Sequence, residues 1–136
     1  MKALEKFFND YAIASMSKDP NRVAGFYAQN FIAATKDQSS AFSNDDKFIE
    51  WLKDIFRFNE KAGLQQMTVK NIEATKVGKY FYRATVKWTV VYKIKPTQKI
   101  DFDIHYILNQ VEDGYKIVLY ISDEDQEQLM KEKGVL

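Results

Sequence analysis

The chain's only histidine lies in the stretch IDFDIHYIL, residues 100–108, where acidic and histidine side chains alternate with large apolar ones. In a β-strand, Asp101, Asp103 and His105 would share one face, about 7 Å apart. These residue types can ligate a metal ion or serve as a general base. That spacing is long for two ligands of one ion, and no second ligand cluster is visible. We therefore expect no metal site and interpret the row as the solvent face of a strand.

Composition excludes several other chemistries. With no cysteine among 136 residues, the chain has no disulfide scaffold, thiolate metal site or cysteine nucleophile. Hydrophobic residues at 46% and aromatic residues at 15% predict a globular core, and the length fits one domain over residues 1–136. Glu5 and Asp10 interrupt the apolar pattern of the N-terminus, and no apolar run is long enough for a membrane span. We expect a soluble, cytoplasmic protein without a membrane partner.

Nucleic acid is not expected as a partner either. The net charge is only +1. Residues 76–99 hold seven Lys or Arg and no acid, but strand alternation places most of the neighbouring aromatic rings on the opposite face. Nucleic-acid platforms need basic groups and stacking rings on one surface.

Hydrophobic periodicity predicts helices first and strands afterwards. A helical stripe covers residues 3–17, and Asp19-Pro20 predicts the cap and first residue of a short second helix. Ser43–Asp46 resembles a capping box opening a third helix that ends near Gly63. The remaining elements are a brief strand at Phe31–Thr35, strands near 66–76, 79–95, 98–112 and 114–122, and a short C-terminal helix within 122–133. This order predicts an α+β fold: three N-terminal helices packed on one face of an antiparallel sheet, with a short C-terminal helix.

Alternation along the strands separates an inner from an outer sheet face. A three-residue turn at Pro96-Thr97-Gln98 predicts that Trp88 lies opposite Tyr106, Lys93 opposite Asp101, Val91 opposite Asp103 and Thr89 opposite His105. The outer face mixes apolar and charged residues, which is typical of an interface between copies, although ordinary exposed strand residues are an equal alternative. The candidate dimer face comprises Phe81, Arg83, Val91, Asp103, His105 and Ile107.

The inner face carries more tyrosine and tryptophan than a plain core requires. Buried Tyr and Trp need hydrogen-bond partners for their polar atoms, and such residues commonly line small-molecule pockets. They could equally fill the wide end of the core. The candidate pocket residues are Tyr11, Tyr27, Thr35, Trp51, Ile55, Trp88, Ile104 and Tyr106, with Thr35 and Asp37 at the mouth. We expect a small apolar ligand and no cofactor.

The stretch FFNDYAIASMSKDPNRVAGFYAQNFIAAT (residues 7–35) resembles the opening of the nuclear transport factor 2-like superfamily, with its SnoaL-like, ketosteroid isomerase and scytalone dehydratase groups. The helix containing Trp51-Leu52 and the closing strand around Asp113-Gly114-Tyr115 fit the same pattern. The resemblance implies a cystatin-like cone, in which a curved sheet wraps around the helices. It also implies a mouth that binds small molecules and a homodimer formed through the outer sheet face.

Most of the catalytic residues of these enzymes have no counterpart in this sequence. By this resemblance Tyr11 occupies the position of the oxyanion-donating tyrosine of ketosteroid isomerases, but the base position falls near Thr35 and the neutral-acid position on Ile104. The paired histidines of scytalone dehydratases are also missing. The leading hypothesis is therefore a small-molecule-binding or accessory domain. The alternatives are a lyase or isomerase with Asp37 as base and Tyr11 as oxyanion donor, and an interaction module that dimerises through its outer face.

Overall fold

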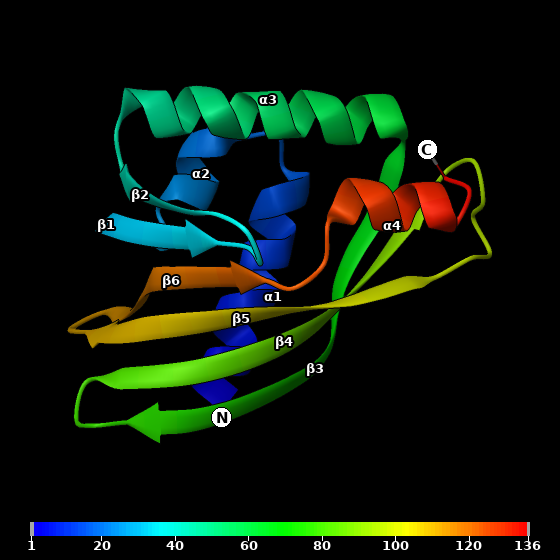
Figure 1. The fold of residues 1–136 in the computed structure, drawn as a ribbon. Helices are drawn as coiled ribbons and strands as arrows, with labels where there is room; N and C mark the ends of the chain where they lie inside the picture. The colour runs from blue at the N-terminus through cyan, green and yellow to red at the C-terminus, as the bar shows by residue number, and fades with distance from the viewer. Residues whose placement is uncertain (1, 136) are drawn as a thin grey trace.

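The computed structural model describes residues 2–135, which form four helices and six strands (Figure 1). In chain order they are α1 (Lys2–Met16), α2 (Pro20–Ala24), β1 (Tyr27–Ala34), β2 (Ser39–Ser43), α3 (Asp46–Ala62), β3 (Leu64–Val77), β4 (Phe81–Tyr92), β5 (Ile100–Val111), β6 (Gly114–Ser122) and α4 (Gln126–Glu132). This is the predicted α+β class. The strand β2 was missed, because SSAFS is short and only one of its five residues is large and apolar.

One sheet carries all six strands in the order β2-β1-β6-β5-β4-β3. Its pairs are antiparallel, except that β1 runs parallel to β6. This mixed sheet corrects the prediction of a purely antiparallel one. The long strands β3, β4 and β5 twist as they cross the molecule, and α1, α2 and α3 lie against the sheet (Figure 1).

Local capping explains where the helices begin and end. Asp19 caps α2 by accepting hydrogen bonds from the backbone N–H groups of Asn21 and Arg22, and Pro20 follows as predicted. Asp45, rather than Ser43, caps α3. Gly63 ends α3 in the left-handed region at φ 80°, which a residue without a Cβ adopts at little cost.

The register between β4 and β5 differs from the predicted one. Trp88 pairs with Phe102, four residues before the predicted partner Tyr106, and Thr89 pairs with Asp101 rather than His105. The strands end at Tyr92 and begin again at Ile100, so the connection is longer than a three-residue turn and the pairs involving Lys93 and Val91 do not form. Because the shift is an even number of residues, the paired side chains of β4 and β5 keep their predicted faces.

Aromatic packing joins α1 to the centre of the sheet. Phe8 is fully buried, and its ring centroid lies 6.3 Å from that of Trp88 and 4.9 Å from that of Tyr106. Trp88 and Tyr106 are themselves 0% and 2% exposed. The inner residues of β4 and β5 thus pack against the first helix as one buried layer. This packing fixes the orientation of the side chains beside them.

The Asp45 cap gives a direct test of how α3 is held. We expect Asp45→Ala to lower the free energy of unfolding by about 1 kcal/mol, because the N–H groups of Lys47 and Phe48 lose their acceptor. Asp45→Asn, which keeps a capping oxygen, should restore most of the loss. Urea unfolding of the two variants and the wild type measures the difference, and equal loss in both variants would contradict the capping role.

Candidate functional site

A cavity of about 160 Å³ lies between the helices and the inner sheet face. Its lining comes from α1, α2, α3 and all strands except β2, together with Gln126 at the start of α4. Most lining residues are aromatic or aliphatic. Dry apolar cavities of about 150 Å³ accept a benzene-sized molecule, so this one has room for roughly one ring.

Seven of the eight candidate pocket residues line this cavity. They are Tyr11, Tyr27, Trp51, Ile55, Trp88, Ile104 and Tyr106. The structure places Thr35 elsewhere, in the exposed connection after β1, where its backbone N–H donates to the carbonyl of Gln38. Asp37 lies in the same exposed turn and does not line the cavity. The mouth predicted from these two residues is therefore wrong.

Several lining residues were missed by the sequence analysis. Tyr120 is the most informative of these, because simple alternation from the buried Ile117 would place Leu119 and Ile121 on the inner face and Tyr120 on the outer one. A β-bulge between the pairs Ile107–Leu119 and Leu108–Ile117 reverses the alternation. Tyr120 then lies opposite Tyr106 and reaches the cavity. Asn59 follows Ile55 by one helical turn on α3, a spacing from which it could have been found.

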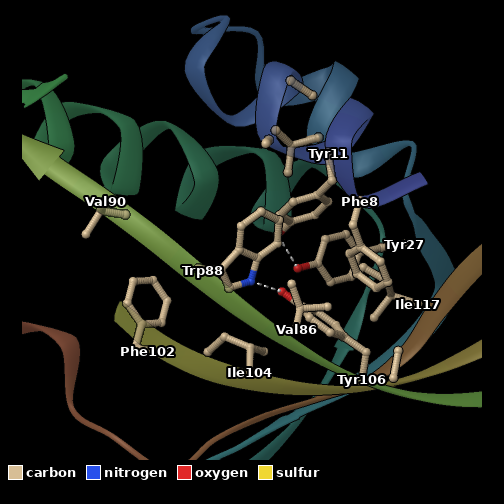
Figure 2. Close-up of a cluster of buried hydrophobic side chains, with 14 of the residues drawn as sticks. Phe8, Tyr11, Tyr27, Val86, Trp88, Val90, Phe102, Ile104, Tyr106 and Ile117 are labelled. Carbon is tan, nitrogen blue, oxygen red and sulfur yellow. Dashed lines mark hydrogen bonds between the residues drawn. The ribbon is translucent and has the colours of Figure 1, made fainter. Parts of the chain in front are cut away.

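Tyrosine and tryptophan side chains supply the polar atoms of the inner end. The hydroxyls of Tyr11 and Tyr27 form a hydrogen bond of 2.8 Å, and the Trp88 indole donates to the Tyr106 hydroxyl at 3.2 Å. Figure 2 shows both contacts beside Trp88. At another point of the lining, the Tyr92 hydroxyl donates to the Met130 sulfur at 3.3 Å, which ties α4 to β4.

Burial keeps these hydroxyl groups protonated. Desolvation is the main cause that raises the pKa of Tyr11, and it raises the pKa of Tyr27 and Tyr106 still further above the ordinary tyrosine value. It also raises the pKa of Tyr92 and Tyr120. At physiological pH all five lining tyrosines are therefore neutral hydrogen-bond donors.

The outer end of the cavity reaches solvent beside Trp51. This side chain is 45% exposed, and its ring stacks on Phe48 with centroids 6.0 Å apart. Ser15, Asn59 and Gln126 are the polar residues of the lining besides the tyrosines and the indoles. Within residues 2–135 the lining contains no acidic, basic or histidine side chain.

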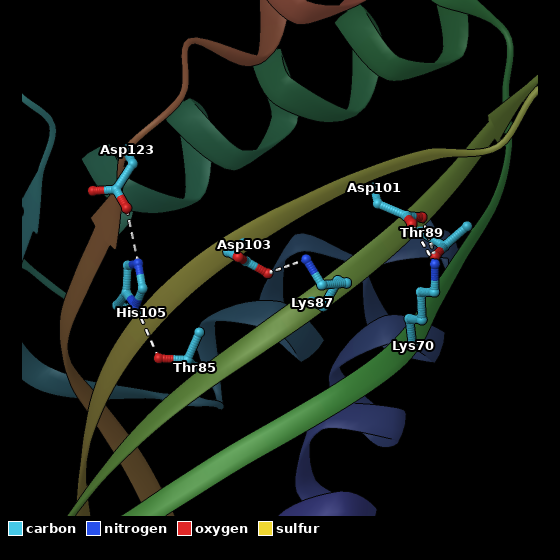
Figure 3. Close-up of polar contacts among 8 residues, drawn as sticks. All are labelled: Lys70, Thr85, Lys87, Thr89, Asp101, Asp103, His105 and Asp123. Atoms are coloured by element: carbon cyan, nitrogen blue, oxygen red, sulfur yellow. Dashed lines mark hydrogen bonds and ion pairs between the residues drawn. The ribbon is translucent and has the colours of Figure 1, made fainter.

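The acid–histidine row lies on the opposite face of the sheet (Figure 3). Asp101 accepts hydrogen bonds from Lys70 at 2.6 Å and Thr89 at 2.7 Å, and Asp103 pairs with Lys87 at 3.1 Å. These contacts match its interpretation as charge partners on a strand face. Across residues 2–135, no three His, Cys, Asp or Glu side chains are grouped to hold a metal ion.

His105 belongs to this outer row. Its Nε2 lies 2.9 Å from an Asp123 carboxylate oxygen, and its Nδ1 lies 2.9 Å from the Thr85 hydroxyl. Acid, imidazole and hydroxyl are thus in line, but they lie on a sheet face turned away from the cavity (Figure 3). Both ring nitrogens are used in holding β4, β5 and the end of β6 together.

Five of the six candidate dimer-face residues are at least partly exposed. They are Phe81, Arg83, Asp103, His105 and Ile107. Val91 is 5% exposed, so its assignment to an open surface is wrong. Three consecutive residues, Val90 to Tyr92, are buried opposite a register shift in β3, so both faces are covered at this end of β4.

Comparison with known proteins identifies the family. The family described as NTF2-like protein (DUF6841) matches residues 2–125, and the chain therefore belongs to this family of nuclear transport factor 2-like proteins. The comparison with curated proteins finds no relative. Across residues 2–135, no helix combines the length and hydrophobicity needed to cross a lipid bilayer.

Solved structures agree on the fold. The chain is similar to an NTF2-like protein of unknown function from Shewanella oneidensis MR-1, with 15% identity, a TM-score of 0.66 and coverage of 90% of this chain and 98% of that one. A domain of unknown function with a cystatin-like fold from Nostoc punctiforme PCC 73102 has 13% identity, a TM-score of 0.69 and coverage of 97% and 83%. An NTF2-like protein with a cystatin-like fold from Novosphingobium aromaticivorans has 12% identity, a TM-score of 0.69 and coverage of 90% and 79%. At these identities the similarity shows the NTF2-like, cystatin-like fold alone.

The Asp101 cluster predicts a small pH-dependent contribution to stability. Hydrogen bonds from Lys70 and then Thr89 lower the pKa of Asp101 in the folded state. The resulting stabilisation is complete above the ordinary aspartate pKa of about 3.9 and is lost as the pH falls through the lowered value. Because Lys70 is 57% exposed, it amounts to well under ~1 kcal/mol.

We expect Lys70→Met to move the Asp101 pKa back toward the ordinary value. Carbon-13 NMR titration of the Asp101 carboxyl group measures this directly. Urea unfolding should show a small deficit for Lys70→Met at neutral pH that disappears in acid. Lys61→Met on exposed α3 is the control, and an Asp101 pKa equal in all three proteins would contradict the assignment.

Proposed function

We propose that this domain binds a small, largely apolar organic molecule in the cavity between its helices and sheet. The supporting observation is the cavity of about 160 Å³ with its aromatic and aliphatic lining. Apolar contact supplies the affinity, and burial of one ring is favourable because water leaves both surfaces. The domain then acts as a carrier, sensor or accessory module for that molecule.

The lyase or isomerase alternative has less support. It requires Tyr11 and Asp37 to act on one substrate, but Tyr11 lines the cavity and Asp37 lies in the exposed β1–β2 turn. A general base must come within hydrogen-bonding reach of the proton that it removes. Binding needs only the apolar walls, which are present. A cytoplasmic location stays a prediction of the sequence.

Filling the cavity from its outer end tests the binding role. Ile55 is half-buried on α3 and lines the cavity, so Ile55→Trp should occupy the space of one ring with little effect on the fold. Fluorobenzene binding, measured by ¹⁹F NMR line broadening, should be saturable with the wild type and at least about tenfold weaker with Ile55→Trp, a loss of roughly 1.4 kcal/mol.

Phe58→Trp provides a matched control on the same helix. Phe58 is 39% exposed and does not line the cavity, so this variant should bind fluorobenzene like the wild type. A wild-type protein that shows no saturable binding of fluorobenzene would refute the proposal.

A second function, self-association through the outer sheet face, is favoured by the pairing of charges on that face. Asp101, Asp103 and His105 each have a partner within the same chain. A face whose charges are already paired can be covered by another chain without leaving an isolated buried charge. Phe81 and Ile107 add apolar surface between the pairs. We propose a homodimer joined through this face.

A charge placed on this face should separate the two copies. We expect Ile107→Glu to shift the protein from dimer to monomer in sedimentation velocity, because a carboxylate would be buried without a partner. Ile13→Glu, at a 57% exposed position on α1, should leave the dimer intact. A monomeric wild type at high micromolar concentration would refute the dimer while leaving ligand binding untouched.

A further inference from the structure

The inner end of the cavity contains a tyrosine proton without an acceptor. A tyrosine hydroxyl can donate one hydrogen bond and accept others. Tyr106 accepts from the Trp88 indole at 3.2 Å, so its own proton points elsewhere. No group within residues 2–135 accepts that proton. Tyr106 is 2% exposed, so it faces the cavity and the core rather than the outer surface of the protein.

The Tyr11–Tyr27 pair supplies a second donor. Their hydroxyl oxygens are 2.8 Å apart and share one hydrogen bond, in which either oxygen can donate. Whichever one donates, the other keeps a proton that has no acceptor in the described chain. Both side chains are 8% exposed. The pair therefore presents one O–H group, as Tyr106 does.

These donors converge on the same space. The Tyr11 ring centroid lies 6.5 Å from that of Tyr106 and 5.9 Å from that of Trp88, and all these side chains line the one cavity. Figure 2 shows the hydroxyl groups of Tyr27 and Tyr106 turned toward the region beside Trp88. No buried side-chain nitrogen or oxygen within residues 2–135 lacks a hydrogen bond altogether. What these tyrosines still offer is the unused proton of each O–H group, and an acceptor at this point would use it.

We propose that the ligand is an uncharged molecule of about one ring whose carbonyl or ether oxygen accepts hydrogen bonds from Tyr106 and from the Tyr11–Tyr27 pair. This inference rests on the binding role proposed above and names the chemical class of the ligand. An anion would lose its hydration without meeting a cation, since none lines the cavity within residues 2–135. A plain hydrocarbon would leave both donors unsatisfied.

Two ligands of similar shape separate the hydrogen bonds from the apolar contact. 4-Fluoroacetophenone carries a carbonyl oxygen, and 4-fluoro-isopropylbenzene replaces it with a methyl group. ¹⁹F NMR titration gives both dissociation constants for each protein. We expect Tyr106→Phe to reduce the preference for the ketone about fivefold, the worth of one net hydrogen bond.

Tyr92→Phe is the matched control. Tyr92 lines the same cavity, but its hydroxyl already donates to the Met130 sulfur. Its removal should therefore leave the preference for the ketone unchanged. Equal losses in Tyr92→Phe and Tyr106→Phe would indicate a general loosening of the cavity and would overturn the assignment.

Infrared spectroscopy of the bound ketone gives a second test that needs no variant. Hydrogen bonds from two hydroxyl groups should move its carbonyl stretch below the value in a hydrocarbon solvent. A bound ketone with the hydrocarbon-solvent frequency, or 4-fluorobenzoate binding as tightly as the ketone, would overturn this inference while the binding role stands. Failure of both neutral ligands to bind would overturn both proposals.

Discussion

The hydrogen bond from the Trp88 indole to the Tyr106 hydroxyl links the core of this protein to its cavity. Both side chains are buried, and both pack against Phe8 of α1. A buried indole N–H needs an acceptor, and Tyr106 provides one only with its hydroxyl turned toward Trp88. The same contact therefore satisfies the core and directs the Tyr106 proton away from it, into the remaining space.

Strand alternation made much of this arrangement predictable from the sequence. Trp88, Ile104 and Tyr106 share a face in any register that shifts by an even number of residues, and the β4–β5 register was wrong by four. The inner face was thus assigned without knowledge of the true pairing. Tyr120 shows the limit of this reasoning. A bulge adds one residue to β6 and reverses the alternation, and it depends on tertiary pairing that no local pattern in the strand reveals.

The residues that were placed at the mouth of the pocket by family resemblance lie outside it, whereas those placed by strand alternation line it. Thr35 and Asp37 were placed at the mouth by analogy with the catalytic positions of related enzymes, and both lie in an exposed turn. The fold of such families persists at identities of 12–15%, because many sequences satisfy one pattern of buried and exposed positions. A particular side chain in a turn is not constrained by that pattern. Tyr11 reached the cavity because it belongs to the buried stripe of α1, which the fold does require.

Polar side chains on the two faces of the sheet find their hydrogen-bond partners in different ways. On the outer face Asp101, Asp103 and His105 each meet a partner from the neighbouring strand β4 or from the segment after β6. On the inner face the partners are other ring side chains, and their hydrogen bonds leave the O–H groups of Tyr106 and of the Tyr11–Tyr27 pair without an acceptor. A charged pair can face solvent or a second protein surface, because its two charges already compensate each other and either surroundings can supply further hydrogen bonds. Neutral donors that point into a largely apolar cavity can be satisfied by a molecule small enough to enter it. In the sequence, the row of Asp101, Asp103 and His105 is the strongest candidate for catalysis or metal binding, but in the structure its side chains hold neighbouring strands together. The tyrosines, which the sequence also allows to be plain core residues, are the side chains whose O–H groups remain free to bind a ligand.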